Sequence, residues 1–208
     1  MKVINIKSCL KISAVCFTLT SAGCISLPNS SMSPTPRFYM LSAINKPEVS
    51  KKINIKPGLI IGVGPVKLPE FLDRPQMVTK EKQGTLKIDE FDRWGESLDL
   101  GLARLVREYL TVMLPGAKLV LYPWGLGVAA KYQVTLEVVQ LDSELDRDMS
   151  FAVQWVVIDV QNSKTVIIKR SVFHQPIIPQ NYSGLAKTLS TACASLSSQI
   201  AQTLSTLP

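Results

Sequence analysis

The residues of this chain that could catalyse a reaction or bind a metal are few and scattered. His174 is the sole histidine, and no second histidine or cysteine pair accompanies it to complete a soft-metal site. The acids within residues 142–148 alternate as in a calcium loop, but the sixth position holds Arg147 instead of Gly and the twelfth holds Val153 instead of Glu. This segment is therefore predicted to be a solvated hairpin turn, and no metal is expected.

Motifs for nucleotide binding and nucleophilic catalysis are also missing from the sequence. Gly62-Val63-Gly64 lacks the third glycine of a dinucleotide loop, because Lys67 stands in its position, and no GKS or GKT occurs. No Gly-x-Ser-x-Gly elbow is found either. Catalysis therefore has no convincing carrier in this sequence, and no cofactor is expected. A lipid-anchored hydrolase is the least favoured alternative, because it needs a nucleophile and a base.

The first 23 residues read as an export signal. The stretch before residue 12 carries three lysines and no acid, and residues 12–22 form an uncharged, largely apolar run of 11. A spanning helix needs about 20 apolar residues, so this run is too short for a permanent anchor. The leader is expected to be removed during export.

The leader ends in Ser21-Ala22-Gly23-Cys24, which resembles the lipobox of bacterial lipoproteins. In that motif small residues admit the signal peptidase, and the cysteine sulfur receives the lipid. Cys24 is therefore predicted to be the acylated first residue, although Ser21 replaces the usual Leu and leaves ordinary secretion as an alternative. Ile25 follows instead of the Asp that retains lipoproteins in the inner membrane, so the periplasmic face of the outer membrane is expected.

The cysteines support a lipoprotein without disulfides. Cys9 and Cys16 leave with the leader and Cys24 carries the lipid, so Cys193 alone remains in the exported domain. Cys193 lies on the apolar face of a predicted helix and is expected to be a packed, reduced thiol.

The net charge argues against nucleic-acid binding. Lys+Arg number 23 and Asp+Glu 16; without the three leader lysines the balance is 20 − 16 = +4. This excess is scattered and forms no basic stripe that could track a phosphate backbone. It is compatible with anionic lipid head groups.

Beyond the leader we expect a tether and one domain. Residues 24–36 comprise the acylated Cys24 and a run rich in Ser and Pro with no helical or strand period. At roughly 3.3 Å per residue this segment reaches up to about 40 Å. Residues 37–208 are predicted to form a single α/β domain.

Hydrophobic periodicity supplies the elements of that domain. We expect amphipathic helices over 96–114, with Leu98, Leu102, Leu105, Tyr109 and Val112 inward, and over 183–204, capped by Ser183. The second helix has few charges on its other face, which either contacts another subunit or is a mildly polar surface. Strands are expected over 38–41, 59–66, 77–80, 85–94, 118–122, 132–141, 151–160 and 166–173. The last three predict an antiparallel meander within a mixed β-sheet.

The candidate partner-binding surface is the proline-rich segment from Pro65 to Gln76. Prolines restrict a loop before binding, so less conformational entropy is lost when it docks. The alternative is a rigid crossover whose Phe71 and Leu72 fold onto the core. The residues assigned to partner binding are Pro65, Leu68, Pro69, Phe71, Leu72, Asp73, Arg74, Pro75 and Gln76, together with the aromatic residues Trp94 and Trp124.

These segments resemble the PqiC-type auxiliary lipoproteins of MCE-domain lipid transport systems, also described as ABC-type transport auxiliary lipoproteins. The matching stretches are Arg37–Leu41, Val63–Gln76, Asp92–Leu98 and Tyr122–Trp124. The resemblance implies an outer-membrane lipoprotein that acts as a binding and scaffolding component, docks to an MCE protein anchored in the inner membrane and does not hydrolyse ATP. Self-association into a homo-oligomer is a separate expectation. A solitary lipid-binding carrier is the alternative, and it needs a deep apolar cavity.

Overall fold

The computed structural model describes residues 34–44, 51–81 and 84–208. The predicted leader and Cys24 lie outside the described residues, as does most of the predicted tether. Residues 35–208 form one compact unit.

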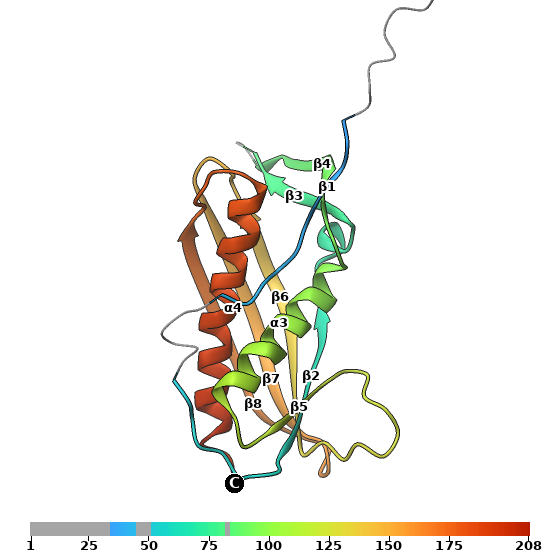
Figure 1. Ribbon diagram of the computed structural model, residues 1–208, viewed down its shortest axis with the longest axis vertical. Helices are drawn as coiled ribbons and strands as arrows, with labels where there is room; N and C mark the ends of the chain where they lie inside the picture. The colour runs from blue at the N-terminus through green and yellow to red at the C-terminus, as the bar shows by residue number, and fades with distance from the viewer. Residues whose placement is uncertain (1–33, 45–50, 82–83) are drawn as a thin grey trace, which may run out of the picture. The chain divides into compact units, whose positions relative to one another are not determined.

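Within the described residues the chain forms eight strands, two α-helices and one short 3₁₀ helix, labelled as in Figure 1. The predicted elements are confirmed, with ends that shift by a few residues. In chain order they are β1 (Arg37–Tyr39), β2 (Ile60–Lys67), η1 (Glu70–Leu72), β3 (Gln76–Lys80), β4 (Leu86–Trp94), α3 (Leu98–Met113), β5 (Lys118–Leu121), β6 (Tyr132–Ser143), β7 (Asp148–Asp159), β8 (Lys164–Pro176) and α4 (Tyr182–Leu204).

The strands form two sheets. The larger has the order β5-β2-β6-β7-β8, in which β2 runs parallel to both β5 and β6, and β6, β7 and β8 form the predicted antiparallel meander. The smaller has the order β1-β4-β3, with β1 parallel and β3 antiparallel to β4. The α/β fold class is thus confirmed, with the mixed strands divided between two sheets.

Both helices cover the same face of the larger sheet, where the core lies (Figure 1). Leu98, Leu102, Leu105 and Tyr109 of α3 are buried as predicted. Val112 is half exposed, and Met113 is buried in its place. The inward position therefore shifts by one residue at the end of the helix, just before the chain turns toward β5.

The sparsely charged helix α4 is buried on more than one side. Its apolar residues Leu185, Leu189, Cys193, Leu196, Ile200 and Leu204 are all inaccessible, as are most of the small residues on its other faces. On one side α4 packs against α3, and on another the Ser190 hydroxyl accepts from the Ser42 amide in the segment after β1. The remaining outer stripe, Lys187, Thr191, Ser195, Ser198 and Gln202, is exposed or partly exposed, which fits the predicted mildly polar surface. A subunit contact on this stripe stays a prediction. Asn181, not Ser183, caps the helix, because its side chain accepts a hydrogen bond from the Gly184 amide.

Cys193 confirms its predicted environment. It is a free cysteine with no exposed surface. Burial raises the pKa of its thiol to about 12. The thiol is therefore protonated at neutral pH and behaves as a small apolar side chain.

No described helix covers the other face of the larger sheet. Residues directly opposite each other on adjacent strands share a face, so Thr135, Val156 and Ile168 form one row across it. Ile168 and Val172 on the edge strand β8 are half exposed or more. The domain thus has two layers, one of helices and one of strands.

Candidate docking surface

The proline-rich segment leaves the end of β2 and forms a structured turn. In β2 Val66 is buried, and Pro65 and Lys67 on either side of it are exposed. The chain then tightens into η1, where the Leu72 amide donates to the Pro69 carbonyl at 2.9 Å. The Trp94 amide donates to the Pro75 carbonyl at 2.7 Å and fastens the end of the turn to β4. The segment is therefore a fixed surface.

Burial divides the predicted contact residues into two groups. Leu72 and Trp94 are core residues, with 4% and 8% of their surface exposed. Leu68 and Phe71 are partly buried and pack against the core. For Leu72 the structure thus favours the alternative interpretation, in which its side chain folds onto the core.

The outward part of the turn is polar and proline-rich. Glu70, Asp73 and Pro75 are exposed, and Pro69, Arg74 and Gln76 are partly buried. The structure describes both Asp73 and Arg74 and shows no ion pair between them. The Arg74 Nε is buried without a hydrogen-bond partner. The backbone hydrogen bonds hold the turn instead.

Trp124 lies on a different surface from Trp94. Its ring covers Gly62 on the face of the sheet that the helices leave open; a Cβ atom built on Gly62 lies 2.2 Å from the ring. The Tyr122 ring meets it edge-on with centroids 5.8 Å apart. Gly62 is therefore the residue that lets the indole lie flat on β2. The structure does not join Trp124 to Trp94 in one site.

A buried carboxylate joins β1 to β4 beside this turn. Asp92, whose side chain is 2% exposed, accepts from Arg37 Nε at 2.8 Å and from the Tyr39 hydroxyl at 2.7 Å. Burial, followed by the bond to Asp92, raises the pKa of Tyr39. The sequence could not pair Arg37 with Asp92, because 55 positions separate them.

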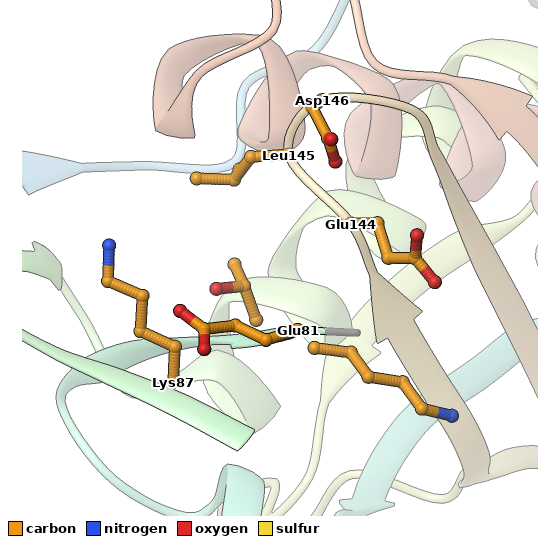
Figure 2. A pocket seen from close by; sticks show the side chains of 7 residues that line it. Glu81, Lys87, Glu144, Leu145 and Asp146 are labelled. Atoms are coloured by element: carbon orange, nitrogen blue, oxygen red, sulfur yellow. The ribbon is translucent and has the colours of Figure 1, made fainter. Parts of the chain in front are cut away.

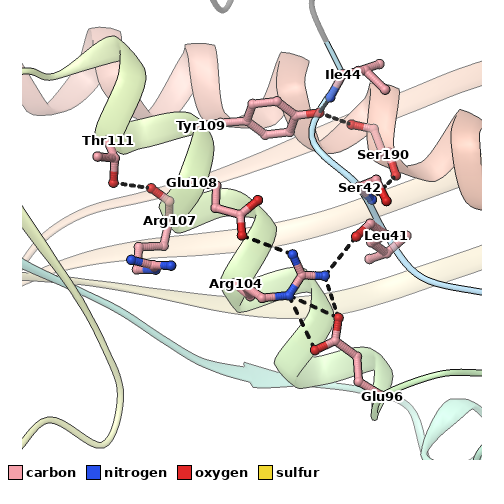
Figure 3. A network of polar contacts seen from close by, with 10 residues as sticks. All are labelled: Leu41, Ser42, Ile44, Glu96, Arg104, Arg107, Glu108, Tyr109, Thr111 and Ser190. Carbon is pink, nitrogen blue, oxygen red and sulfur yellow. Dashed lines mark hydrogen bonds and ion pairs between the residues drawn. The ribbon is translucent and has the colours of Figure 1, made fainter.

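A second polar network holds the segment after β1 on the helices (Figure 3). Arg104 donates to the Leu41 carbonyl at 2.8 Å and forms ion pairs with Glu96 and Glu108. The Tyr109 hydroxyl accepts from the Ile44 amide at 3.0 Å. This network was not predicted from the sequence, in which only the spacing of four residues between Arg104 and Glu108 signals part of it. The segment from Arg37 to Ile44 is therefore fixed to both sheet and helix.

The pocket in Figure 2 lies between the β3–β4 hairpin and the turn that joins β6 to β7. It has a volume of about 390 Å³ and is lined mainly by charged and polar side chains: Thr79, Lys80, Glu81, Lys87, Glu144, Leu145 and Asp146. Such a lining does not suit an acyl chain, since burying charge beside hydrocarbon is costly. This pocket is therefore not the deep apolar cavity that a lipid carrier needs.

The predicted turn within residues 142–148 is confirmed. The Glu144 amide donates to the Asp148 carbonyl at 2.9 Å, and Arg147 forms an ion pair with Glu144. Within the described residues no group of three or more His, Cys, Asp or Glu side chains is placed to hold a metal ion.

One row on the open face brings together residue types used by hydrolases. The strand registers place Ser150 between Asp142 and His174. A catalytic triad needs the histidine between the other two, with hydrogen bonds to both. Here Asp142 bonds instead to Lys80 at 3.0 Å and to Gln140 at 2.8 Å. The row lacks the geometry of a triad.

Solved structures share this fold. An uncharacterized protein matches with a TM-score of 0.65 and 18% identity, covering 83% of this chain and 100% of its own. Protein XCC0632 from Xanthomonas campestris matches with a TM-score of 0.61 and 10% identity, covering 79% and 92%. At these identities the likeness concerns the fold alone. No curated protein matches the chain.

The family comparison agrees with the resemblance seen in the sequence. Residues 39–201 match the model of the ABC-type transport auxiliary lipoprotein component, a family of transport proteins and not of enzymes. In the part of the chain that the structure describes, no helix has both the length and the apolarity to span a bilayer. The matched range includes every strand except the first two residues of β1, all of α3, most of α4 and the proline-rich turn. The chain therefore belongs to the family of ABC-type transport auxiliary lipoprotein components.

Proposed function

We propose that this protein is the outer-membrane docking subunit of an MCE-type intermembrane lipid transport system. Membership of the auxiliary lipoprotein family is the observation that carries the proposal, because such a component acts by binding the rest of a transport system. The partner is an MCE-domain protein anchored in the inner membrane. The role is one of docking and scaffolding that maintains the envelope.

Cys24 anchors the domain in this proposal. Its acylated sulfur holds the chain in the outer membrane, and the segment up to residue 36 lets the domain stand away from the lipid. Replacing Cys24→Ala is expected to release the protein into the soluble periplasm, as measured by membrane fractionation. An intact mass for the wild-type protein that shows an unmodified chain would contradict the anchor.

The outward part of the proline-rich turn is the proposed contact with the MCE protein. Asp73 and Pro75 are exposed on a backbone that hydrogen bonds already fix, so docking costs little conformational entropy. Leu72 and Trp94 support this surface from below. In this proposal the exposed residues of the turn contact the partner through their shape and charge, and its large apolar residues stabilise the domain.

The test is a pull-down of the MCE protein with the double variant Asp73→Lys/Pro75→Ser. The Pro75 carbonyl that accepts from the Trp94 amide is kept in this variant, so the turn remains in place. Affinity for the partner is expected to fall about tenfold or more, as at the centre of an interface. The melting temperature is expected to remain nearly constant.

The matched control is Asp146→Lys/Pro115→Ser, which makes the same substitutions at exposed positions outside the turn. Partner binding should be unchanged in the control. Equal losses in both variants, or no loss in either, would remove the turn from the docking site. Self-association belongs to the same proposal and is measured by light scattering of the purified protein.

A further inference from the structure

The loop between β5 and β6 displays an apolar side chain at its tip. Residues 122–130 carry no charge and include two aromatic residues. The Val128 amide donates to the Gly125 carbonyl, and Gly127 has a φ of +88°. This is the geometry of a type II turn, which needs glycine at its third position. Leu126 occupies the second position and is fully exposed.

The loop is firmly held on the sheet at both ends. At its start the Tyr122 amide donates to the Val63 carbonyl at 2.9 Å, and Trp124 covers Gly62. At its end the Lys131 amide donates to the Ile60 carbonyl at 2.8 Å, and Ala130 is buried. Because both ends of the loop are held on the sheet, the exposed position of Leu126 belongs to an ordered loop.

Basic residues gather at the end of the domain where this loop returns to the sheet and β6 begins. Lys118 and Lys131 flank Ile60 in the sheet, since Lys118 opposes Ile60 in the register and the Lys131 amide bonds to its carbonyl. Lys131 is paired with Asp159. Five other lysines at this end are exposed, and among the described residues the structure shows no ion pair for them: Lys51, Lys52, Lys56, Lys118 and Lys164.

The two ends of the domain differ sharply in charge. The segments at the basic end, residues 51–59, 114–131, 160–164 and 205–208, hold six lysines and no acid, and Asp159 beside them neutralises one of the six, Lys131. The described segments at the opposite end, residues 68–76, 81, 84–90 and 142–148, hold nine acids and three bases. A surface of negative charge would therefore attract the first end and repel the second.

We propose that the basic end, together with Leu126 at the tip of the adjoining β5–β6 loop, binds the surface of an anionic phospholipid bilayer. Leu126 enters the boundary between head groups and acyl chains, and the exposed Tyr122 ring lies at the level of the head groups. The lysines contact lipid phosphates. A single leucine on a convex turn suits a fluid surface, whereas a protein contact centres on a packed pocket. This binding is independent of the proposed MCE partner.

The experiment is co-sedimentation of residues 35–208, which contain all the described elements and the core, with two kinds of vesicle. One is phosphatidylcholine alone, and the other contains about one third phosphatidylglycerol, so that the surface is negative. The wild-type protein is expected to sediment with the anionic vesicles and to be released by salt. Leu126→Ser and Lys118→Glu/Lys164→Glu should each lower the partition coefficient about tenfold.

The matched controls are Leu100→Ser and Lys187→Glu, which alter exposed residues away from the basic end and should bind as the wild type does. Absence of wild-type binding, or equal binding to both vesicles, would overturn the proposal. So would a Leu126→Ser variant that binds like Leu100→Ser. Capture of an acidic protein by the lysines without vesicle binding would assign this end to a protein partner instead.

Discussion

Two loops beside β2 contain similar residues and use them in opposite ways. The turn after β2 places Leu72 in the core, whereas the loop between β5 and β6 leaves Leu126 fully exposed. Both are rich in residues that break regular structure, and both contain aromatic side chains. The difference lies in backbone position: Leu72 ends a 3₁₀ turn above the sheet, and Leu126 stands at the corner of a turn that points outward. The composition of a loop therefore does not decide whether its apolar side chains are exposed or packed on the core.

The largest expected effect separates these two leucines. Leu72→Ala should lower the free energy of unfolding by about 2–5 kcal/mol, because it leaves a cavity in a packed core. Leu126→Ala removes no buried contact and should change it by less than about 0.5 kcal/mol. Urea unfolding of both variants measures the difference. Similar losses from both would show that the second loop also supports the core.

A smaller effect is expected where the second loop rests on the sheet. Gly62→Val places side-chain atoms where the Trp124 ring lies, so it should displace the indole and cost about 1–3 kcal/mol of stability. Acrylamide quenching of tryptophan fluorescence should increase. Gly125→Val is the control, since a Cβ at Gly125 has no neighbour within 4 Å. Unchanged quenching in Gly62→Val would mean that the loop is not anchored through Trp124.

The smallest effect concerns the ion pair at the end of the same loop. The hydrogen bond from Lys131, followed by the one from Asn162, lowers the pKa of Asp159 to about 2. Because the folded pKa is lowered, this pair's contribution is present above the unfolded pKa near 4 and is lost as the pH falls through about 2. Lys131→Ala should move the Asp159 midpoint upward in an NMR titration of the carboxyl carbons. An unmoved midpoint would show that Lys131 does not hold this carboxylate.

The regular elements could be predicted because their patterns are local. Alternation marked β6, β7 and β8, and three- and four-residue spacing marked α3 and α4, so their existence and order followed from the sequence. The ends were less certain. Asn181 caps α4 although Ser183 is an equally good capping residue, because the choice depends on where the chain leaves the preceding turn.

The candidate site could be located in the sequence but not divided into buried and exposed parts. The proline pattern from Pro65 to Gln76 predicts a restricted turn, and in the structure backbone hydrogen bonds join this turn to itself and to β4. That Leu72 faces inward depends on the small sheet beneath it. The contact between Arg37 and Asp92 likewise arises when β1 joins β4, an event that no local pattern records. Pairings of this kind belong to tertiary structure.

The uneven distribution of lysines and acids gives the domain a permanent electric dipole. Near a negatively charged bilayer such a dipole experiences a torque as well as an attraction. The domain would therefore rotate before it contacts the bilayer. At physiological salt the field extends over about 8 Å, and reorientation is confined to the last approach. If the proposed anchor at Cys24 holds the domain near the membrane, the domain would return to that zone repeatedly and would sample this orientation many times.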